Sequence, residues 1–231
     1  MQIIQRRAAP AGSTDPYRAQ RSLILHFDGS SIVDTSPRPK TITVRSGVAL
    51  TTSFSKFGGS SVGFAGSTTA YLSTGSHSDF AFGTGNFTVE AWLRQTTDAQ
   101  YSTFIEIGNH INNTGIAFLA GNNTSVGTYG AYSGGFYAGD GVARTFNSLQ
   151  HVAWVRSSNS LLIYKNTALI ATRTFTNNLT DTSLIGIGYA PTGGGSLANY
   201  IYTGQMDELI VTKGVALSPS EFAYTSAVPD V

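Results

Sequence analysis

The chain has 231 residues and no cysteine, and only 12% of its residues are charged, with 14 basic against 13 acidic side chains. The missing cysteines exclude disulfides and thiol chemistry, and the near-neutral balance gives no global attraction to nucleic acid or membranes. No apolar run approaches the roughly 20 residues that span a bilayer, and the start lacks the apolar stretch of a signal peptide. We therefore expect a protein made in a cytoplasm, with no nucleic-acid partner and no membrane insertion.

Residues 1–22 differ in composition from the rest of the chain, with four arginines, two prolines and few large apolar side chains. Such a segment buries too little surface to fold alone and stays disordered unless a partner orders it. We predict an N-terminal anchoring arm at 1–22 that orders on a protein neighbour, followed by a domain at 23–231. The residues expected to contact the partner are Ile3, Ile4, Arg6, Arg7, Tyr17, Arg18 and Arg21.

From Leu23 onwards, strands and turns alternate along the chain. The run from Asn86 to Gln95 alternates apolar and polar side chains, which is typical of a half-buried strand. The other predicted strands lie at 151–156, 160–175, 183–190 and 200–213, and the second of these turns back on itself at 165–167. Short glycine-rich breaks separate them. This pattern predicts one all-β domain, in the form of a two-sheet antiparallel sandwich.

Five blocks of sequence, in this order, resemble a known superfamily: LILHFDGS, SKFGGSSVGFAGSTTAYLS, SDFAFGTGNFTVEAWLR, LQHVAWVRSSNSLLIYKNTALIAT and GQMDELIVTKGVALSPSEF. Together they resemble the concanavalin A-like lectin/glucanase superfamily, in the laminin G-like form found in bacteriophage structural proteins. The resemblance implies a jelly roll of two antiparallel sheets, one of them concave. One departure is Asn166-Thr167, where the family commonly has Asn-Gly or Asp-Gly. Because threonine tolerates positive φ poorly, we expect a longer or different turn there.

The carboxylates give little sign of catalysis. A retaining glucanase needs two carboxylates about 5 to 5.5 Å apart on one face. Asp207 and Glu208 are adjacent in a strand, so alternation points them to opposite faces. Glu90, on the strand that follows Asn86, has no acidic neighbour on its own face. We therefore predict that the chain is not an enzyme.

A structural calcium ion is implied by the resemblance. Many members of the superfamily hold one with an aspartate of the last strand plus backbone carbonyls of the first, and the matching position here is Asp207, near the turn at Asp28. Hard oxygen ligands at a loop–strand junction suit Ca²⁺. The alternative is that one carboxylate of the Asp207–Glu208 pair only braces neighbouring loops. The four histidines are scattered without zinc spacing, and no other cofactor is expected.

Aromatic side chains in glycine-rich loops provide material for a sugar site, because a sugar offers an apolar face and a ring of hydroxyls. A second group, Tyr189, Tyr200 and Tyr202, flanks a triple glycine. From sequence alone we prefer the alternative that these aromatics pack loops or line a subunit interface, where tyrosine is also enriched. The candidate glycan-binding residues are Trp92, Tyr129, Tyr132, Phe136, Tyr137 and Asp140.

Taken with the resemblance, these features predict a non-enzymatic virion structural protein, such as a capsid decoration, fibre or tail-associated protein, made in the host cytoplasm. Its arm would bind other virion proteins, its loops would be exposed for adhesion to a host surface glycan or for stabilisation, and it would form a homo-oligomer such as a trimer. The alternative is a carbohydrate-binding lectin module that acts at a cell surface.

Overall fold

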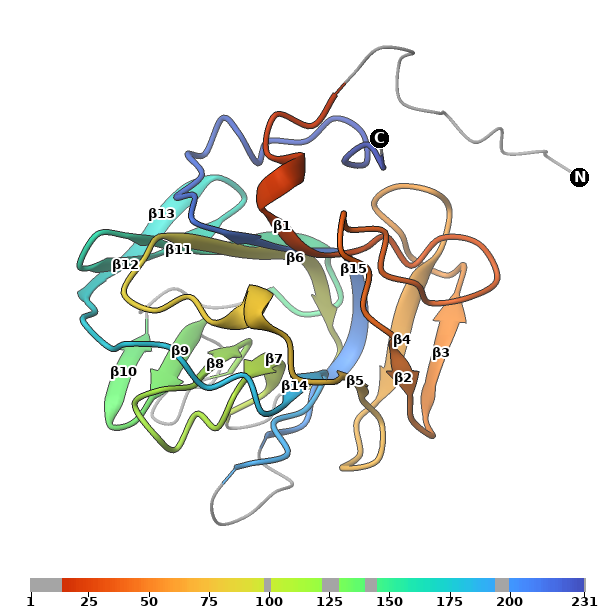
Figure 1. The fold of residues 1–231 in the computed structure, drawn as a ribbon. Helices are drawn as coiled ribbons and strands as arrows, with labels where there is room; N and C mark the ends of the chain where they lie inside the picture. Colours follow the sequence, from red (N-terminus) through yellow and green to blue (C-terminus); the bar gives the residue numbers. More distant parts are fainter. Residues whose placement is uncertain (1–13, 98–100, 122–128, 140–144, 194–199, 231) are drawn as a thin grey trace, which may run out of the picture.

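Two antiparallel β-sheets that face each other form the body of the protein (Figure 1). The computed structural model describes residues 14–97, 101–121, 129–139, 145–193 and 200–230. The larger sheet has eight strands: β1 (Arg21–Leu25), β3 (Val48–Thr51), β4 (Ser61–Ala65), β6 (Phe87–Gln95), β11 (Gln150–Ser157), β12 (Ser160–Lys165), β13 (Ala168–Thr174) and β15 (Thr203–Lys213). The smaller sheet has seven: β2 (Thr43–Val44), β5 (Leu72–Thr74), β7 (Thr103–Ile107), β8 (Ile116–Leu119), β9 (Gly130–Ser133), β10 (Phe136–Gly139) and β14 (Ile185–Ile187). The predicted all-β, two-sheet sandwich is confirmed.

Strands distant in sequence lie side by side in both sheets. The order is β13-β12-β11-β6-β15-β4-β3 in the larger sheet, with β1 also paired to β15, and β10-β9-β8-β7-β14-β5-β2 in the smaller one. Two short 3-10 turns lie outside the sheets, η1 (Arg18–Gln20) and η2 (Ser78–Phe80). Neither has the length or apolar character needed to cross a membrane.

The core between the sheets comes from the period-2 alternation of the strands. In β6, Val89 points into the core, whereas Glu90 and Trp92 lie on the outer face. Trp154 of β11 is fully buried, and its ring stacks on Phe104 of the opposite sheet at a centroid distance of 4.6 Å. The indole N–H of Trp154 donates to a backbone carbonyl at 2.7 Å, so this large side chain is buried without an unpaired donor.

The turn between β12 and β13 is a two-residue turn with positive φ at both positions, so the prediction of a longer or different turn was wrong. Asn166 and Thr167 both adopt positive φ, 47° and 71°. Such turns match the right-handed twist of a hairpin. Asn166 also anchors the turn to β11, because its side chain accepts the backbone N–H of His151 at 3.0 Å and donates to Gln150 at 2.8 Å. These bonds offset the strain at Thr167.

The described part of the predicted arm folds onto its own domain. β1 begins at Arg21, inside the segment predicted to be an arm, and this side chain is only 1% exposed. The Tyr17 hydroxyl donates to Glu221, and Arg18 donates to the Thr35 carbonyl at 2.7 Å. These three residues were predicted to contact a partner, and in the structure they make contacts within the chain, so the prediction of a partner stays untested. The other four predicted arm contacts lie outside the described residues: Ile3, Ile4, Arg6 and Arg7.

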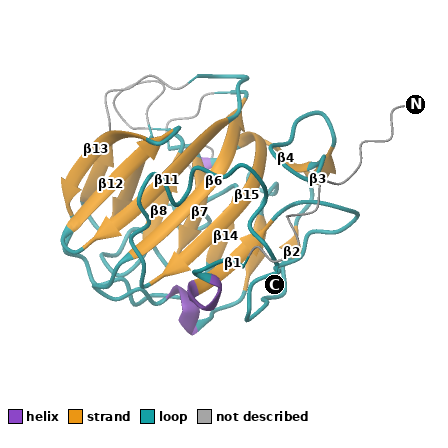
Figure 2. Ribbon diagram, turned by 90° about the horizontal axis from the view of Figure 1, so that it is seen from above, coloured by secondary structure: helices purple, strands orange, loops and turns teal. Residues whose placement is uncertain are grey.

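The segment that follows β15 covers part of the outer face of the eight-stranded sheet (Figure 2). Leu217 and Phe222 pack on outward-facing residues of β11, and Val228 packs between Ile24 of β1 and Ile210 of β15. As a result this sheet is buried on both faces over much of its area, and polar residues on it become enclosed.

Candidate functional site

A β-bulge in β15 places Asp207 and Glu208 differently from the sequence prediction. The pairing of β15 with β6 shifts register between Asp207 and Ile210, and Glu208 has a φ of 50°. Asp207 pairs with the outward-facing Trp92, while Glu208 contacts His26, which lies on the same outer face. The prediction that the two carboxylates point to opposite faces was wrong, because the bulge interrupts strand alternation.

Asp207 is fully buried, and its Oδ2 accepts the backbone N–H groups of Lys56 and Phe57 at 2.5 and 3.2 Å. Burial raises the pKa of this carboxyl to about 8, and the neighbouring charges of Glu208 and Asp28 act in the same direction. Asp207 therefore braces the loop between β3 and β4.

Glu208 is buried beside the imidazole of His26. Their atoms Oε2 and Nδ1 lie 2.7 Å apart, and His26 Nε2 lies 3.0 Å from Asp230 in the C-terminal segment. Burial lowers the pKa of His26, but the hydrogen bond and charge of Glu208, aided by Asp230, outweigh it and raise the pKa to about 9. The imidazolium thus connects β1, β15 and the C-terminal segment.

The chemistry of this region fits the predicted calcium ion in part. Asp28 lies close enough to Asp207 and Glu208 to raise the pKa of both, and all three offer hard oxygen ligands. Within the described ranges Glu208 Oε1 is buried without a hydrogen-bond partner. In the same ranges, however, no three acidic or histidine side chains converge into a metal-binding group. A calcium ion here would need backbone carbonyls or water as further ligands, so the site stays a proposal.

The predicted glycan-binding residues separate into three environments. Tyr129 lies in the core, 3% exposed, with its ring 6.0 Å from that of Trp154. Phe136 packs on the buried Phe175 at 4.6 Å. Tyr129 thus fills space between the sheets, and Phe136 packs against the same core while staying half-buried. Trp92 lies on the outer face of the eight-stranded sheet, and Asp140 falls outside the described residues.

Tyr132 and Tyr137 remain as neighbours on the outer face of the seven-stranded sheet. They are directly paired across β9 and β10, and the same row continues through Ala117 of β8 to Glu106 of β7. Both tyrosines are half-buried. Directly opposite residues in antiparallel strands lie close enough for their side chains to interact, and this pair is called the aromatic, or tyrosine, surface below.

Glu106 and His110 form a buried polar network next to this surface, which the sequence alone did not reveal. Both side chains are fully buried and bonded to each other, and the Thr192 hydroxyl donates to Glu106. The backbone N–H groups of His110 and Thr192 also reach Glu106, each at 3.4 Å. The network ties the loops after β7 and β14 to the sheet. The i,i+4 spacing of Glu106 and His110 in the sequence is compatible with a contact between them. It predicts that contact only once both residues are known to lie on the outer face of the sheet.

A stack of two tyrosines extends the aromatic surface beyond His110. The Tyr101 and Tyr200 rings stack at 4.8 Å, and the His110 ring lies 5.3 Å from Tyr200 and 5.6 Å from Tyr132. Burial raises the pKa of Tyr200, and the nearby tyrosines and Glu106 add to this effect. The Tyr200 phenol therefore stays neutral and can both donate and accept hydrogen bonds.

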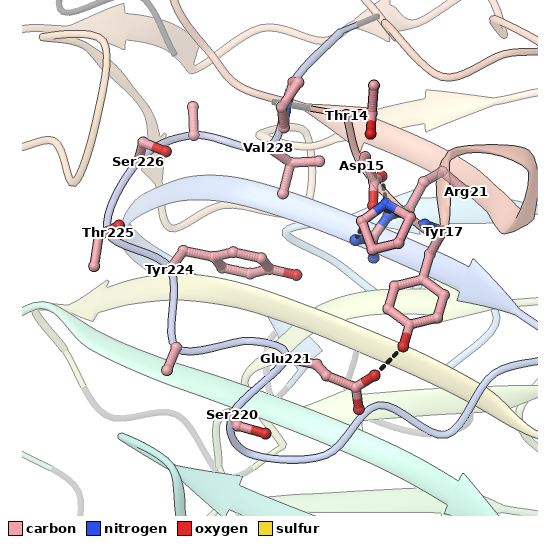
Figure 3. Close-up of a pocket in the computed structure, with 14 residues that line it drawn as sticks. Thr14, Asp15, Tyr17, Arg21, Ser220, Glu221, Tyr224, Thr225, Ser226 and Val228 are labelled. Carbon is pink, nitrogen blue, oxygen red and sulfur yellow. Dashed lines mark hydrogen bonds and ion pairs between the residues drawn. The ribbon is translucent and has the colours of Figure 1, made fainter. Parts of the chain in front are cut away.

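A cavity of about 410 Å³ lies elsewhere, between residues 14–21 and 220–229 (Figure 3). Its charged groups already pair with one another. Arg21 donates to Asp15 at 2.8 Å and to Thr212 at 2.6 Å, and the Tyr224 hydroxyl donates to Glu90 at 2.9 Å. Because these groups form hydrogen bonds and ion pairs with each other, the cavity is an internal contact region between the two terminal segments. The tyrosine surface is therefore the better candidate for ligand binding.

The fold and the aromatic surface define the class of protein as a lectin-like β-sandwich. The family model described as the concanavalin A-like lectin/glucanases superfamily matches residues 66–223, more than half of the chain. The chain belongs to this superfamily, which confirms the resemblance seen in the sequence. No curated protein shows significant sequence similarity to it.

Several solved structures share the fold. Domain 4 of AbnA, an extracellular arabinanase from Geobacillus stearothermophilus solved with arabinotriose, has a TM-score of 0.66 and 16% identity, covering 88% of this chain and 97% of that domain. The receptor-binding domain of botulinum neurotoxin D has a TM-score of 0.67 and 13% identity, covering 90% of this chain and 52% of that one. The binding domain of Paraclostridial Mosquitocidal Protein 1 has a TM-score of 0.62 and 14% identity, with coverages of 90% and 52%. The chain thus spans about half the length of the toxin binding domains.

Proposed function

We propose that the chain is a non-catalytic carbohydrate-binding module that holds its ligand on the tyrosine surface of the seven-stranded sheet. The observation that carries this proposal is the paired, half-buried Tyr132 and Tyr137 beside the buried Glu106–His110 network. Tyrosine rings match the apolar face of a sugar ring, and the Tyr132 hydroxyl on its rigid strand can bond the sugar hydroxyls, whereas the Tyr137 hydroxyl is buried. The fold shared with a domain solved with arabinotriose supports the same ligand class.

The carboxylates of the described residues support binding over catalysis. Glu106 is fully buried, and its oxygens are occupied by His110 and Thr192. Asp207 and Glu208 share a face but are 0% and 3% exposed, so a glycosidic bond has no access to them. A glycosidase needs both carboxyl groups in contact with its substrate.

The test is isothermal titration calorimetry with a panel of neutral oligosaccharides that includes arabinotriose. Wild-type protein should bind at least one, and the variant Tyr132→Ala/Tyr137→Ala should lose about tenfold or more in affinity. The matched control is Tyr164→Ala, which removes a half-buried tyrosine from the eight-stranded sheet. Equal binding by the double variant and wild type, with circular dichroism unchanged, would place the site elsewhere. Binding of no neutral glycan would reject the proposal.

Within that function we further propose a virion location, with the module exposed for adhesion and residues 1–13 attached to another virion protein or a sister subunit. The support is the ordered set of sequence blocks that resembles bacteriophage structural proteins. Because residues 14–22 fold onto the domain, the informative truncation starts at Thr14. Full-length protein should co-sediment with particles lacking it and form a homo-oligomer such as a trimer, while the truncated chain should do neither. Equal behaviour of the two forms would contradict the anchoring role.

A further inference from the structure

Two cations lie over aromatic rings at one end of the eight-stranded sheet, on the opposite side of the sandwich from the tyrosine surface. The Lys56 ammonium lies 4.2 Å from the centre of the Trp92 ring, and the Arg94 guanidinium lies 3.7 Å from the centre of the Phe54 ring. The three residues Lys56, Trp92 and Arg94 are half-buried, and Phe54 is 40% exposed. We call these four residues the cationic patch.

The surrounding structure holds both cations in place. Asp207 accepts the backbone N–H of Lys56, which fixes the β3–β4 loop over Trp92. Arg94 donates to Gln205 at 2.6 Å and to the Asn147 side chain at 3.2 Å. Both of these partners are neutral amides, so the guanidinium is oriented without being neutralised.

The positive charge of the patch is not balanced locally. Among the described residues, no carboxylate lies within ion-pair distance of Lys56 or Arg94, whereas Arg21 and Lys40 each have such a partner. The acidic group beneath the loop is Asp207, and its side chain accepts the backbone N–H groups of Lys56 and Phe57, with no ion pair to either cation among the described residues. Two unneutralised cations in a chain of nearly zero net charge form a local anion-attracting surface.

The spacing within the patch suits a sugar polymer that carries regular acidic groups. Trp92 and Arg94 are two residues apart on one strand face, which is about 7 Å, and each ring face next to a cation is already occupied. A nucleobase cannot stack on those covered faces, whereas a carboxylate or sulfate can contact the cations from outside. We propose that the cationic patch is a second binding site, specific for anionic polysaccharides through their carboxylate or sulfate groups.

The experiment measures binding of the full chain to immobilised heparin and polygalacturonate, with dextran as the neutral comparison. Wild-type protein should bind both acidic polymers and not dextran, with affinity falling as salt rises. The variant Lys56→Gln/Arg94→Gln should lose about tenfold or more, because charge-assisted contacts are among the strongest polar ones. The control Arg173→Gln/Lys213→Gln removes the same charge from β13 and β15 and should bind within about twofold of wild type.

Two outcomes would overturn the proposal. One is an equal loss of affinity for the acidic polymers in both double variants. The other is that a single-stranded oligonucleotide binds at Lys56 and Arg94 more tightly than either polymer does. The variant Tyr132→Ala/Tyr137→Ala separates this site from the tyrosine surface, because it should keep its affinity for the acidic polymers. Loss of polymer binding in that variant would place the acidic site on the tyrosine surface and reject the patch.

Discussion

The stability of the folded chain should fall as pH rises through the titration of His26. This imidazole is 9% exposed and lies between Glu208 and Asp230, whose side-chain oxygens are 2.7 and 3.0 Å away. Its pKa is raised from 6.5 to about 9 in the folded state, because the bond to Glu208 outweighs the opposing effect of burial. The protonated form is therefore bound more tightly by the folded chain than by the unfolded chain.

The sign and size of the effect follow from linkage. The stabilisation by protonated His26 is fully present below its unfolded pKa of 6.5 and is lost as pH rises through about 9. At 1.36 kcal/mol per pKa unit, this difference corresponds to about 3 kcal/mol. Asp207 acts in the same direction over a lower range, since its raised pKa removes stability as pH rises from 3.8 towards 8. The pH ranges of the two titrations overlap, so a variant of His26 is needed to separate its contribution to stability from that of Asp207.

The assay is urea unfolding of wild type and His26→Gln at several values between pH 6 and 10. The variant should be less stable than wild type at pH 6, and the gap should narrow by about 3 kcal/mol at pH 10. The control Asp230→Asn removes the outer partner, whose side chain is 55% exposed, and should change stability by less than about 1 kcal/mol. A gap between wild type and His26→Gln that stays constant across this range would refute the role assigned to the imidazolium.

Three further predictions concern the turn, the carboxylates and the core. Thr167→Gly should stabilise the protein by about 0.5 to 1 kcal/mol in urea unfolding, since Thr167 has positive φ. Asn166→Gly should destabilise it, because it removes two side-chain hydrogen bonds. The reverse order of stabilities would contradict the strain assigned to Thr167. Calcium should raise the melting temperature of wild type over that in a chelator, and Asp207→Asn should abolish this rise. Trp154→Ala should cost about 3 to 5 kcal/mol, while a loss below about 1 kcal/mol would argue against its central packing.

The fold class was predictable because the main strands have an alternation that fixes which face of each strand is buried. In β6, the apolar set with Val89 faces the core and the polar set with Glu90 faces outwards. A one-residue slip would reverse every side chain, so the pattern fixes the buried face. The sequence could not show which strands pair, since β6 lies between β11 and β15, which are distant in the chain.

The candidate site was predictable only in part. Composition identified Tyr132 and Tyr137 but grouped them with Tyr129, which lies one strand position before β9 and turns inwards to Trp154. The grouping failed because a glycine-rich segment gives no periodicity from which to infer the facing of each ring. Glu106 was missed for a different reason. An acidic residue in an otherwise apolar strand is expected to face outwards into solvent, and only the loops packed over it reveal that it is buried.

The bulge in β15 explains why the Asp207–Glu208 pair resisted interpretation from sequence. A non-glycine residue with positive φ is uncommon, so nothing in the residues around Glu208 predicts that it adopts this conformation. The cause lies in the pairing: one edge of β15 bonds to β4 up to Met206 and to β1 from Leu209 onwards. The bulge falls where the strand changes partner. Asp207, on one side of it, holds the loop of the cationic patch, and Glu208, on the other, holds His26 and the C-terminal segment. A single backbone irregularity therefore orders both regions, and this accounts for two buried carboxylates without assigning them any catalysis.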